Sequence, residues 1–253
     1  LRYVNADFRS YPLVLSAPGA KTKARLISNG SGLNLRGGSR SWRDVGVPFS
    51  FRVGPDEFPF GGRGDRVSEP KPADGYLPIH AIEYRHPFPV QSEGLVPINV
   101  RPAPRVPEVY RLEAFASTDP AHADSCVVFV KFSLAAGTNG VVSVVPDPSA
   151  LARFAGGIVR DGSGSPILHL DSSWRWERGG ARATLKPGTV ATLAAVVKPL
   201  ADPSFRLAAG DYDRFRRRAV DDWNALLDRG MKVEIPEPRV NHARRNLLIQ
   251  NFM

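Results

Sequence analysis

The chain of 253 residues is long enough for one large β domain or for two smaller domains with sizeable cores. Its 42% apolar and 9% aromatic content is typical of a globular protein, and no apolar run approaches the roughly 20 residues of a membrane span. The net charge of +9 is uneven, because residues 1–54 carry nine Lys and Arg side chains against two Asp. These basic residues are scattered and form no nucleic-acid-binding motif, so we expect no nucleic-acid partner.

Short segments with the period of strands follow one another up to residue 197. Apolar residues that alternate or run continuously predict strands at 45–53, 109–117, 127–134, 141–145 and 189–197. Asn139-Gly140 is a strong hairpin signal, and Pro187-Gly188 marks a turn. The proline-rich stretch from Pro55 to Pro107 predicts long surface loops broken by short edge strands such as 76–84. Because no helix is interleaved, the pattern predicts an antiparallel β-sandwich.

After Pro203 the apolar period becomes that of helices. One helix is predicted from a face formed by Tyr212, Phe215, Ala219, Trp223, Leu226 and Leu227. The extended link "VEIPEP" follows, and Pro238 suits the first turn of a second helix. The apolar stripe predicted for that second helix consists of Val240, Ala243, Leu247 and Leu248. We expect both stripes to need a packing partner outside the sandwich.

The common catalytic signatures are missing from the sequence. It contains no GxSxG elbow, Walker A loop, HExxH or CxxC pair, and its five histidines match no metal-ligand spacing. We therefore predict no metal and no cofactor in this chain. Cys126 precedes an apolar strand and is interpreted as a packing residue. Glu237, immediately before Pro238, is interpreted as a helix N-terminal residue rather than as a general acid or base.

Three tryptophans are the candidate substrate-binding residues. Trp174 and Trp176 in "SSWRWERGG" are two positions apart, so both rings lie on one face if the segment is a strand. Such a pair is either a stacking platform for sugar rings or a plug in a core or domain interface, and the sequence leaves both open. Trp42 in "SRSWRDVG" has the same ambiguity.

The C-terminal region resembles the junction seen in six-hairpin, or (α/α)6-barrel, glycosidases. The resemblance lies in "LKPGTVATLAAVVKPL" and in the later "W…L…G" and "IPEPRVNHA" patterns. The matching residues are Trp223, Leu226, Gly230, Ile235, Pro236, Glu237, Val240, Ala243, Leu247 and Gln250. "DVGVPFSFRV" is also similar to a strand that is common in the sandwiches of such enzymes.

The resemblance implies a mainly β fold with three parts. Residues 1–203 would form a supersandwich-like antiparallel β-sandwich, 204–236 a linker helix and extended link, and 237–253 the start of the (α/α)6 barrel. The complete protein would then be a glycoside hydrolase that cleaves a poly- or oligosaccharide by carboxylate acid/base catalysis. The catalytic residues would lie beyond Met253, in a barrel portion on the same or a separate chain, and this chain alone would be inactive. The implied address is secreted or periplasmic.

Two alternatives remain open at this level. One is a stand-alone β-sandwich that binds carbohydrate through Trp174 and Trp176. The other is the β domain of an (α/α)-toroid polysaccharide lyase, for which a basic surface suits an acidic glycan.

Overall fold

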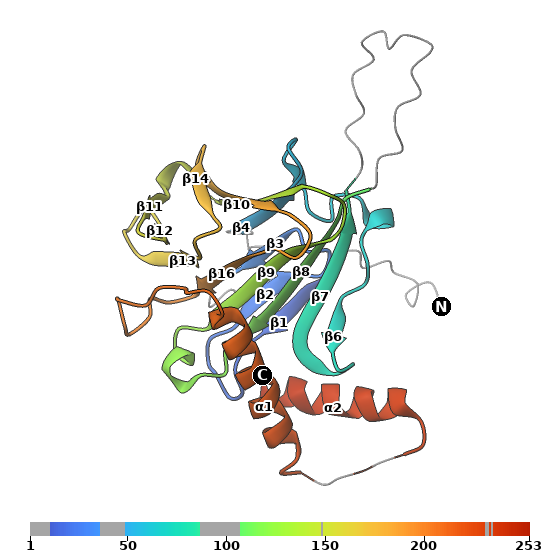
Figure 1. The fold of residues 1–253 in the computed structure, drawn as a ribbon. Helices are drawn as coiled ribbons and strands as arrows, with labels where there is room; N and C mark the ends of the chain where they lie inside the picture. The colour runs from blue at the N-terminus through green and yellow to red at the C-terminus, as the bar shows by residue number, and fades with distance from the viewer. Residues whose placement is uncertain (1–10, 36–48, 87–106, 148, 231–232, 234) are drawn as a thin grey trace, which may run out of the picture.

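The computed structural model describes residues 11–35, 49–86, 107–147, 149–230, 233 and 235–253. Within them the fold is mainly β, with two eight-stranded antiparallel sheets in a sandwich-like arrangement and two α-helices, as Figure 1 shows. The prediction of a mainly β, antiparallel architecture is confirmed. None of the helices in these ranges is long and apolar enough to cross a membrane.

Sheet A is the first of the two sheets. Its strands are β1 (Pro12–Leu15), β2 (Ala24–Ile27), β3 (Gly32–Asn34), β4 (Phe49–Val53), β5 (Phe58–Pro59), β10 (Gly140–Pro146), β14 (Arg175–Glu177) and β15 (Gly180–Leu185). Their order is β1-β2-β3-β4-β10-β15-β14, and β5 pairs with β4 outside this path.

Sheet B is formed by the remaining strands. They are β6 (Lys71–Ala73), β7 (Leu77–Arg85), β8 (Val109–Ala116), β9 (Val127–Ala136), β11 (Arg153–Ala155), β12 (Ile158–Arg160), β13 (Pro166–Leu170) and β16 (Val190–Val196). Their order is β11-β12-β13-β16-β9-β8-β7-β6. The described residues also contain three short 3-10 turns: η2 (Gly64–Arg66), η3 (Pro120–His122) and η4 (Ser149–Leu151).

The main core lies between the two sheets. On β8 the predicted inward face is confirmed, since its four members are all buried there: Tyr110, Leu112, Ala114 and Ala116. Phe51 of sheet A meets Phe132 of sheet B edge-to-face, with ring centroids 5.1 Å apart. Edge-to-face pairs of this kind add about 0.5–1.5 kcal/mol beyond their buried area. The sandwich is therefore held by side chains that both sheets contribute.

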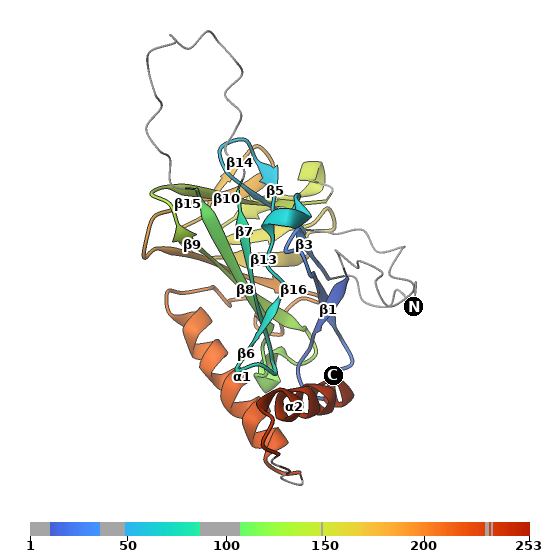
Figure 2. The ribbon, with the colours of Figure 1, turned by 90° about the vertical axis from the view of Figure 1, so that its right-hand side faces the viewer.

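Helix α1 (Asp211–Leu227) covers the outer face of sheet B, as Figure 2 shows. Four of its predicted apolar residues are buried: Tyr212, Phe215, Ala219 and Trp223. They pack on the alternate residues of the strands, those that point away from the main core, and Phe215 stacks on Phe129 at 4.7 Å. The expectation that this helix needs a partner outside the sandwich is wrong, because sheet B itself is the partner.

Helix α2 (Pro238–Phe252) crosses the end of the sandwich near β6 (Figure 2). Glu237 is its N-cap and accepts a hydrogen bond from the backbone N–H of Arg239, so the structural interpretation of Glu237 is confirmed. Ile249 is the buried residue of this helix. The predicted stripe faces outward instead: Val240, Ala243 and Leu247 are exposed and Leu248 is half-buried.

The connection between β9 and β10 is not the predicted hairpin. The two strands belong to different sheets, so the chain crosses from sheet B to sheet A between them. A two-residue hairpin of the Asn-Gly type needs positive φ at both central residues. Neither Asn139 nor Gly140 has one, and the left-handed position is Gly137, at φ 113°. The Asn-Gly signal therefore located the end of one strand and the start of the next correctly, but the connection joins two sheets and is not a hairpin within one sheet.

The strand predicted as a short edge at 76–84 is neither short nor an edge. It is β7, which has nine residues and is hydrogen-bonded on both sides, to β6 and β8. The turn predicted at Pro187-Gly188 is confirmed, with Gly188 at φ 81°. The predicted face of the strand at 45–53 is confirmed from Phe49 to Val53, and Val45 and Val47 lie outside the described residues.

Candidate functional site

Trp174 is a core residue. Its side chain is 5% exposed, and its indole Nε1 donates a hydrogen bond of 2.8 Å to the carbonyl of Thr192. The ring meets Phe132 edge-to-face at 6.0 Å. Since β14 begins one residue later, Trp174 does not lie in the strand that was assumed for a paired platform. The core interpretation holds for this residue, and the interpretation as a sugar platform does not.

Trp176 lies at the edge of the sandwich. It is half-buried in β14 and stacks on Phe154 of β11, with centroids 5.7 Å apart and planes within 9°. β14 is the edge of sheet A and β11 the edge of sheet B, so this pair joins the two sheets at one side. The structure does not bring Trp174 and Trp176 together on one open face. Trp42 lies outside the described residues.

Helix α1 is anchored to sheet B by a charged cluster around Glu113. Oε1 of Glu113 accepts hydrogen bonds from Arg216 Nε at 2.8 Å and from the Tyr212 hydroxyl at 2.9 Å. Lys131 Nζ lies 3.8 Å from the same oxygen and 4.4 Å from the centre of the Tyr212 ring. Burial by itself raises the pKa of Glu113, but the charges and hydrogen bonds of Arg216, Lys131 and Tyr212 outweigh it and lower the pKa. The cluster is a structural anchor.

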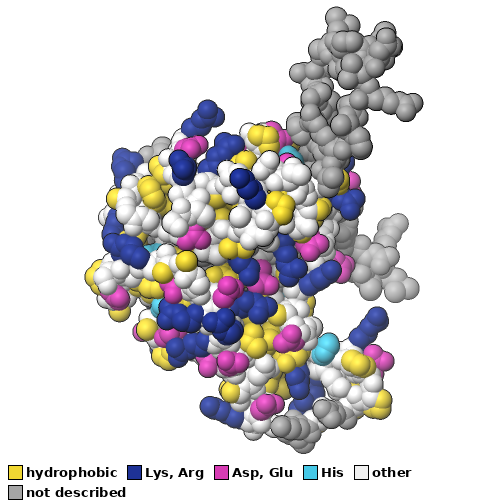
Figure 3. All heavy atoms as spheres, in the orientation of Figure 1, with side chains coloured by type: hydrophobic (Ala, Val, Ile, Leu, Met, Phe, Trp, Pro, Cys, Tyr) yellow, Lys and Arg dark blue, Asp and Glu magenta, His cyan; other side chains and the backbone are white. Residues whose placement is uncertain are grey.

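Besides Arg216, two further arginines of α1 pair with acidic neighbours. Arg214 pairs with Asp211 at 2.6 Å, and Arg218 pairs with Asp119 at 2.6 Å. Figure 3 shows blue and magenta side chains interspersed over this part of the surface. These pairs locally compensate part of the positive charge of α1, in a chain whose net charge is +9.

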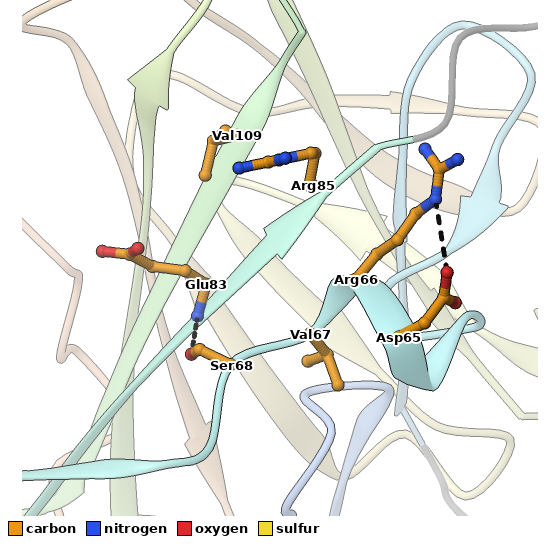
Figure 4. Close-up of a pocket in the computed structure, with 7 residues that line it drawn as sticks. All are labelled: Asp65, Arg66, Val67, Ser68, Glu83, Arg85 and Val109. Carbon is orange, nitrogen blue, oxygen red and sulfur yellow. Dashed lines mark hydrogen bonds and ion pairs between the residues drawn. The ribbon is translucent and has the colours of Figure 1, made fainter.

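One cavity lies on the outer face of sheet B beside η2 (Figure 4). Its volume is about 540 Å³, and its lining residues are Asp65, Arg66, Val67, Ser68, Glu83, Arg85 and Val109. Figure 4 shows Arg66 beside Asp65, and the closest atoms of this pair are 3.9 Å apart. Two arginines and two carboxylates line the cavity, so it offers a ligand no excess of either charge.

A second cavity, called the α2 cavity, lies where the sandwich meets α2. It measures about 590 Å³, within the range of roughly 300–1,000 Å³ that ligand pockets occupy. One wall is the segment of β1 with Tyr11 before it, and a second comes from the region of β6 and β7. The third wall is the end of α2, with Asn246, Ile249 and Gln250.

Apolar surface dominates the α2 cavity, and a few polar groups interrupt it. The apolar part includes two tyrosines and four prolines: Tyr11, Tyr76, Pro12, Pro70, Pro72 and Pro78. Lys23 is the lysine among its lining residues, and no Asp or Glu is among them. Apolar walls with a few polar groups are the composition of sites that bind small ligands.

His80 is the polar group in the floor of the α2 cavity. Its Nδ1 is buried and has no hydrogen-bond partner among the described residues. Burial lowers the pKa of His80 to about 4, so the ring is neutral at neutral pH. A neutral imidazole offers one donor and one acceptor. A ligand hydroxyl, which can donate and accept, is the group that matches it.

The α2 cavity was not predicted from the sequence. Its residues come from chain segments that begin at Tyr11 and end at Met253, and no motif spacing links them. The signal that pointed to it is the cluster of prolines from Pro70 to Pro78, which was interpreted only as loop and edge strand. In the described part of the chain no three His, Cys, Asp or Glu side chains gather as metal ligands.

Comparison with known proteins adds no family to this geometry. No protein-family model matches the chain, and no curated protein matches it.

Proposed function

We propose that this chain is the non-catalytic N-terminal part of a glycoside hydrolase that cleaves a poly- or oligosaccharide. Catalytic carboxylates would then lie in an (α/α)6 barrel that packs beside α2. Such an enzyme would act outside the cytoplasm, as a secreted or periplasmic protein. The support comes from the sandwich, the helix that follows it, and the outward side of α2.

The observation that carries the proposal is the exposed apolar side of α2. Leu247 is 61% exposed and Val240 is 48% exposed. Leu247 and the buried Ile249 are two positions apart, which is about 200° around the helix, so these residues lie on opposite faces. Figure 3 shows yellow side chains on the open surface of this helix. Exposed apolar residues that gather on one helix face mark an interaction site, and further barrel helices would cover them.

The alternatives have less support. A stand-alone carbohydrate-binding sandwich was inferred from a double-tryptophan platform, and Trp174 is buried. A polysaccharide lyase was inferred from the basic surface. Part of that positive charge is compensated by nearby carboxylates, as in the pair of Arg218 with Asp119.

An activity assay tests the proposal. Residues 1–253 and the complete protein that carries them are incubated with neutral and acidic polysaccharides, and new reducing ends are measured. We expect release by the complete protein and none by residues 1–253. Absorbance of unsaturated products in the ultraviolet would identify a lyase instead. Absence of any cleavage by the complete protein, over a broad panel of glycans, would overturn the proposal.

A further inference from the structure

We propose that the α2 cavity binds one acidic sugar residue, a uronate, at the end of a glycan chain. This inference rests on the proposed function, because it assumes a glycan ligand, and it adds the class of sugar and the place where it is held. The argument uses the shape, the charge and the hydrogen-bonding groups of the cavity.

The walls of the cavity suit a saturated ring with an apolar face. Tyr11 and Tyr76 present aromatic surface, and Pro12, Pro70 and Pro78 present rigid apolar surface. Tyr76 is fixed in place because its hydroxyl donates a hydrogen bond of 2.7 Å to Asn224 Oδ1 of α1. Because Tyr76 is 7% exposed and Arg245 lies over its ring at 4.8 Å, Tyr76 gives the cavity a rigid edge, and the prolines and Tyr11 supply the apolar surface for the sugar.

Hydrogen-bonding groups of the cavity suit hydroxyls. Gln250 Nε2 donates to Asn246 Oδ1 at 2.8 Å on α2. This bond leaves the carboxamide oxygen of Gln250 and the amide N–H groups of Asn246 for a ligand. Across the cavity, the buried Nδ1 of His80 has no partner among the described residues. Ligand hydroxyls suit the Asn246 and Gln250 amides, because each hydroxyl donates and accepts, and they reach Nδ1 of His80 only if the cavity wall shifts.

Charge selects an acidic sugar over a neutral one. Lys23 is exposed at the cavity, and no described residue forms an ion pair with it. No Asp or Glu side chain lines the cavity, and a ligand carboxylate meets the ammonium group of Lys23 there. A sugar that carries a carboxylate combines the apolar face, the hydroxyls and this charge.

Titration of the protein with D-glucuronate and D-galacturonate, followed by ligand-observed NMR, tests the proposal. Glucose and galactose are the matched neutral sugars, and cyclohexanecarboxylate is the matched carboxylate without hydroxyls. We expect one uronate to bind at least tenfold more tightly than its neutral sugar and than cyclohexanecarboxylate. Equal binding of cyclohexanecarboxylate, or no binding of either uronate, would overturn the proposal.

Two exposed residues of the cavity give variants that keep the fold. Lys23→Gln is expected to weaken uronate binding about fivefold and to leave neutral sugars unchanged. Gln250→Ala is expected to weaken uronates and neutral sugars alike. Lys21→Gln is the control, because Lys21 is exposed two residues away and does not line the cavity. Equal effects of the two lysine variants would contradict the assigned site.

Failure of this inference differs from failure of the proposed function. If the complete protein cleaves a glycan but residues 1–253 bind no uronate, only the cavity assignment is wrong. If a uronate binds as described and no glycan is cleaved, the enzyme proposal is wrong and the cavity remains a sugar-binding site.

Discussion

Helices α1 and α2 both carry regularly spaced apolar residues, but only α1 buries its predicted face. Tyr212, Phe215 and Trp223 of α1 are all less than 7% exposed on sheet B. On α2 the predicted stripe points outward, and Ile249 on the other side makes the buried contact. The difference teaches that a helical period identifies residues that share a face, whereas the neighbouring surface decides whether that face is covered.

The anchoring of α1 has two components that α2 lacks. One is an aromatic row in which Tyr212 meets Phe115 at 5.3 Å, and Phe115 stacks on Phe129 at 5.5 Å. The other is the Glu113 cluster. Helix α2 is held instead by Ile249, by a hydrogen bond from the Gly19 N–H to the carbonyl of Phe252, and by contacts of its side chains with Tyr76. Substitutions that weaken the attachment of one helix at a time test this difference between α1 and α2.

The largest expected effect comes from the buried tryptophan of α1. Trp223→Ala should lower the free energy of unfolding by about 3–5 kcal/mol, because Trp223 is 1% exposed and its loss leaves a cavity. Leu247→Ala on α2 is the matched control and should change it by less than about 0.5 kcal/mol. Urea denaturation measures both. Comparable losses in the two variants would show that α2 is as firmly packed as α1.

Removing the charge of Glu113 should weaken α1 next most. Glu113→Gln is expected to lower the free energy of unfolding by about 1.5–3 kcal/mol at pH 7. The reason is that the Glu113 carboxylate accepts charge-assisted hydrogen bonds from Arg216 and Tyr212, which the neutral amide weakens. Because the folded pKa of Glu113 is lowered, its stabilisation is present above the unfolded value of 4.5 and is lost as pH falls through the folded pKa. The difference between wild type and variant should therefore shrink on acidification. A difference that is constant from pH 7 to pH 3 would exclude this role.

Two buried histidines should make stability depend on pH near each helix. His80 lies at the α2 cavity and His169 lies beside Phe205, before α1. Burial lowers the pKa of each to about 4 from 6.5, so only the unfolded chain binds protons between these values and stability falls as pH drops from 6.5 to 4. Each contributes a slope of up to about 1.4 kcal/mol per pH unit.

Single replacements separate the two histidines. His169→Gln should remove nearly the full slope, and His80→Gln should remove less, because local opening of α2 hydrates His80 without global unfolding. The measurement is the free energy of unfolding at several values of pH between 6.5 and 5. A larger slope change for His80 than for His169 would contradict weak attachment of α2.

Among the substitutions of buried residues, Ile249→Ala is expected to have the smallest effect on global stability. The loss in the global free energy of unfolding cannot exceed the free energy with which α2 docks on the sandwich. Once that docking free energy is lost, α2 detaches while the rest of the fold remains. Hydrogen exchange should accelerate at the backbone amides of α2 and remain unchanged in α1. Acceleration that spreads to α1 and sheet B would show that the two helices form one cooperative unit.

Much of the architecture could be predicted from local patterns. Period two on β8 identified the inward residues, and period 3.6 on α1 identified the residues that sheet B covers. The predictions that were wrong concern features that depend on residues distant in the sequence. The Asn139-Gly140 signal describes a turn within one sheet, and it cannot reveal that β9 and β10 have better neighbours in two different sheets.

The candidate site was harder to predict than the fold. Trp174 and Trp176 have the spacing of residues on one strand face, which suggested a stacking platform. However, Trp174 precedes β14, and its indole N–H donates a hydrogen bond to the carbonyl of Thr192. Spacing along the chain does not reveal such a bond. The α2 cavity exists only because the first described strand and the last helix meet, and no local pattern encodes that meeting.

The crossing between the sheets has a consequence for biosynthesis. β9 lies between β8 and β16, and β10 lies between β4 and β15, so each has one neighbour made earlier and one made later. A ribosome delivers the chain from its N-terminus, and neither strand has both neighbours until residues 180–196 have emerged. A nascent chain that stalls before Gly180 presents two apolar, unpaired strand edges at once, which are the surfaces most prone to aggregation.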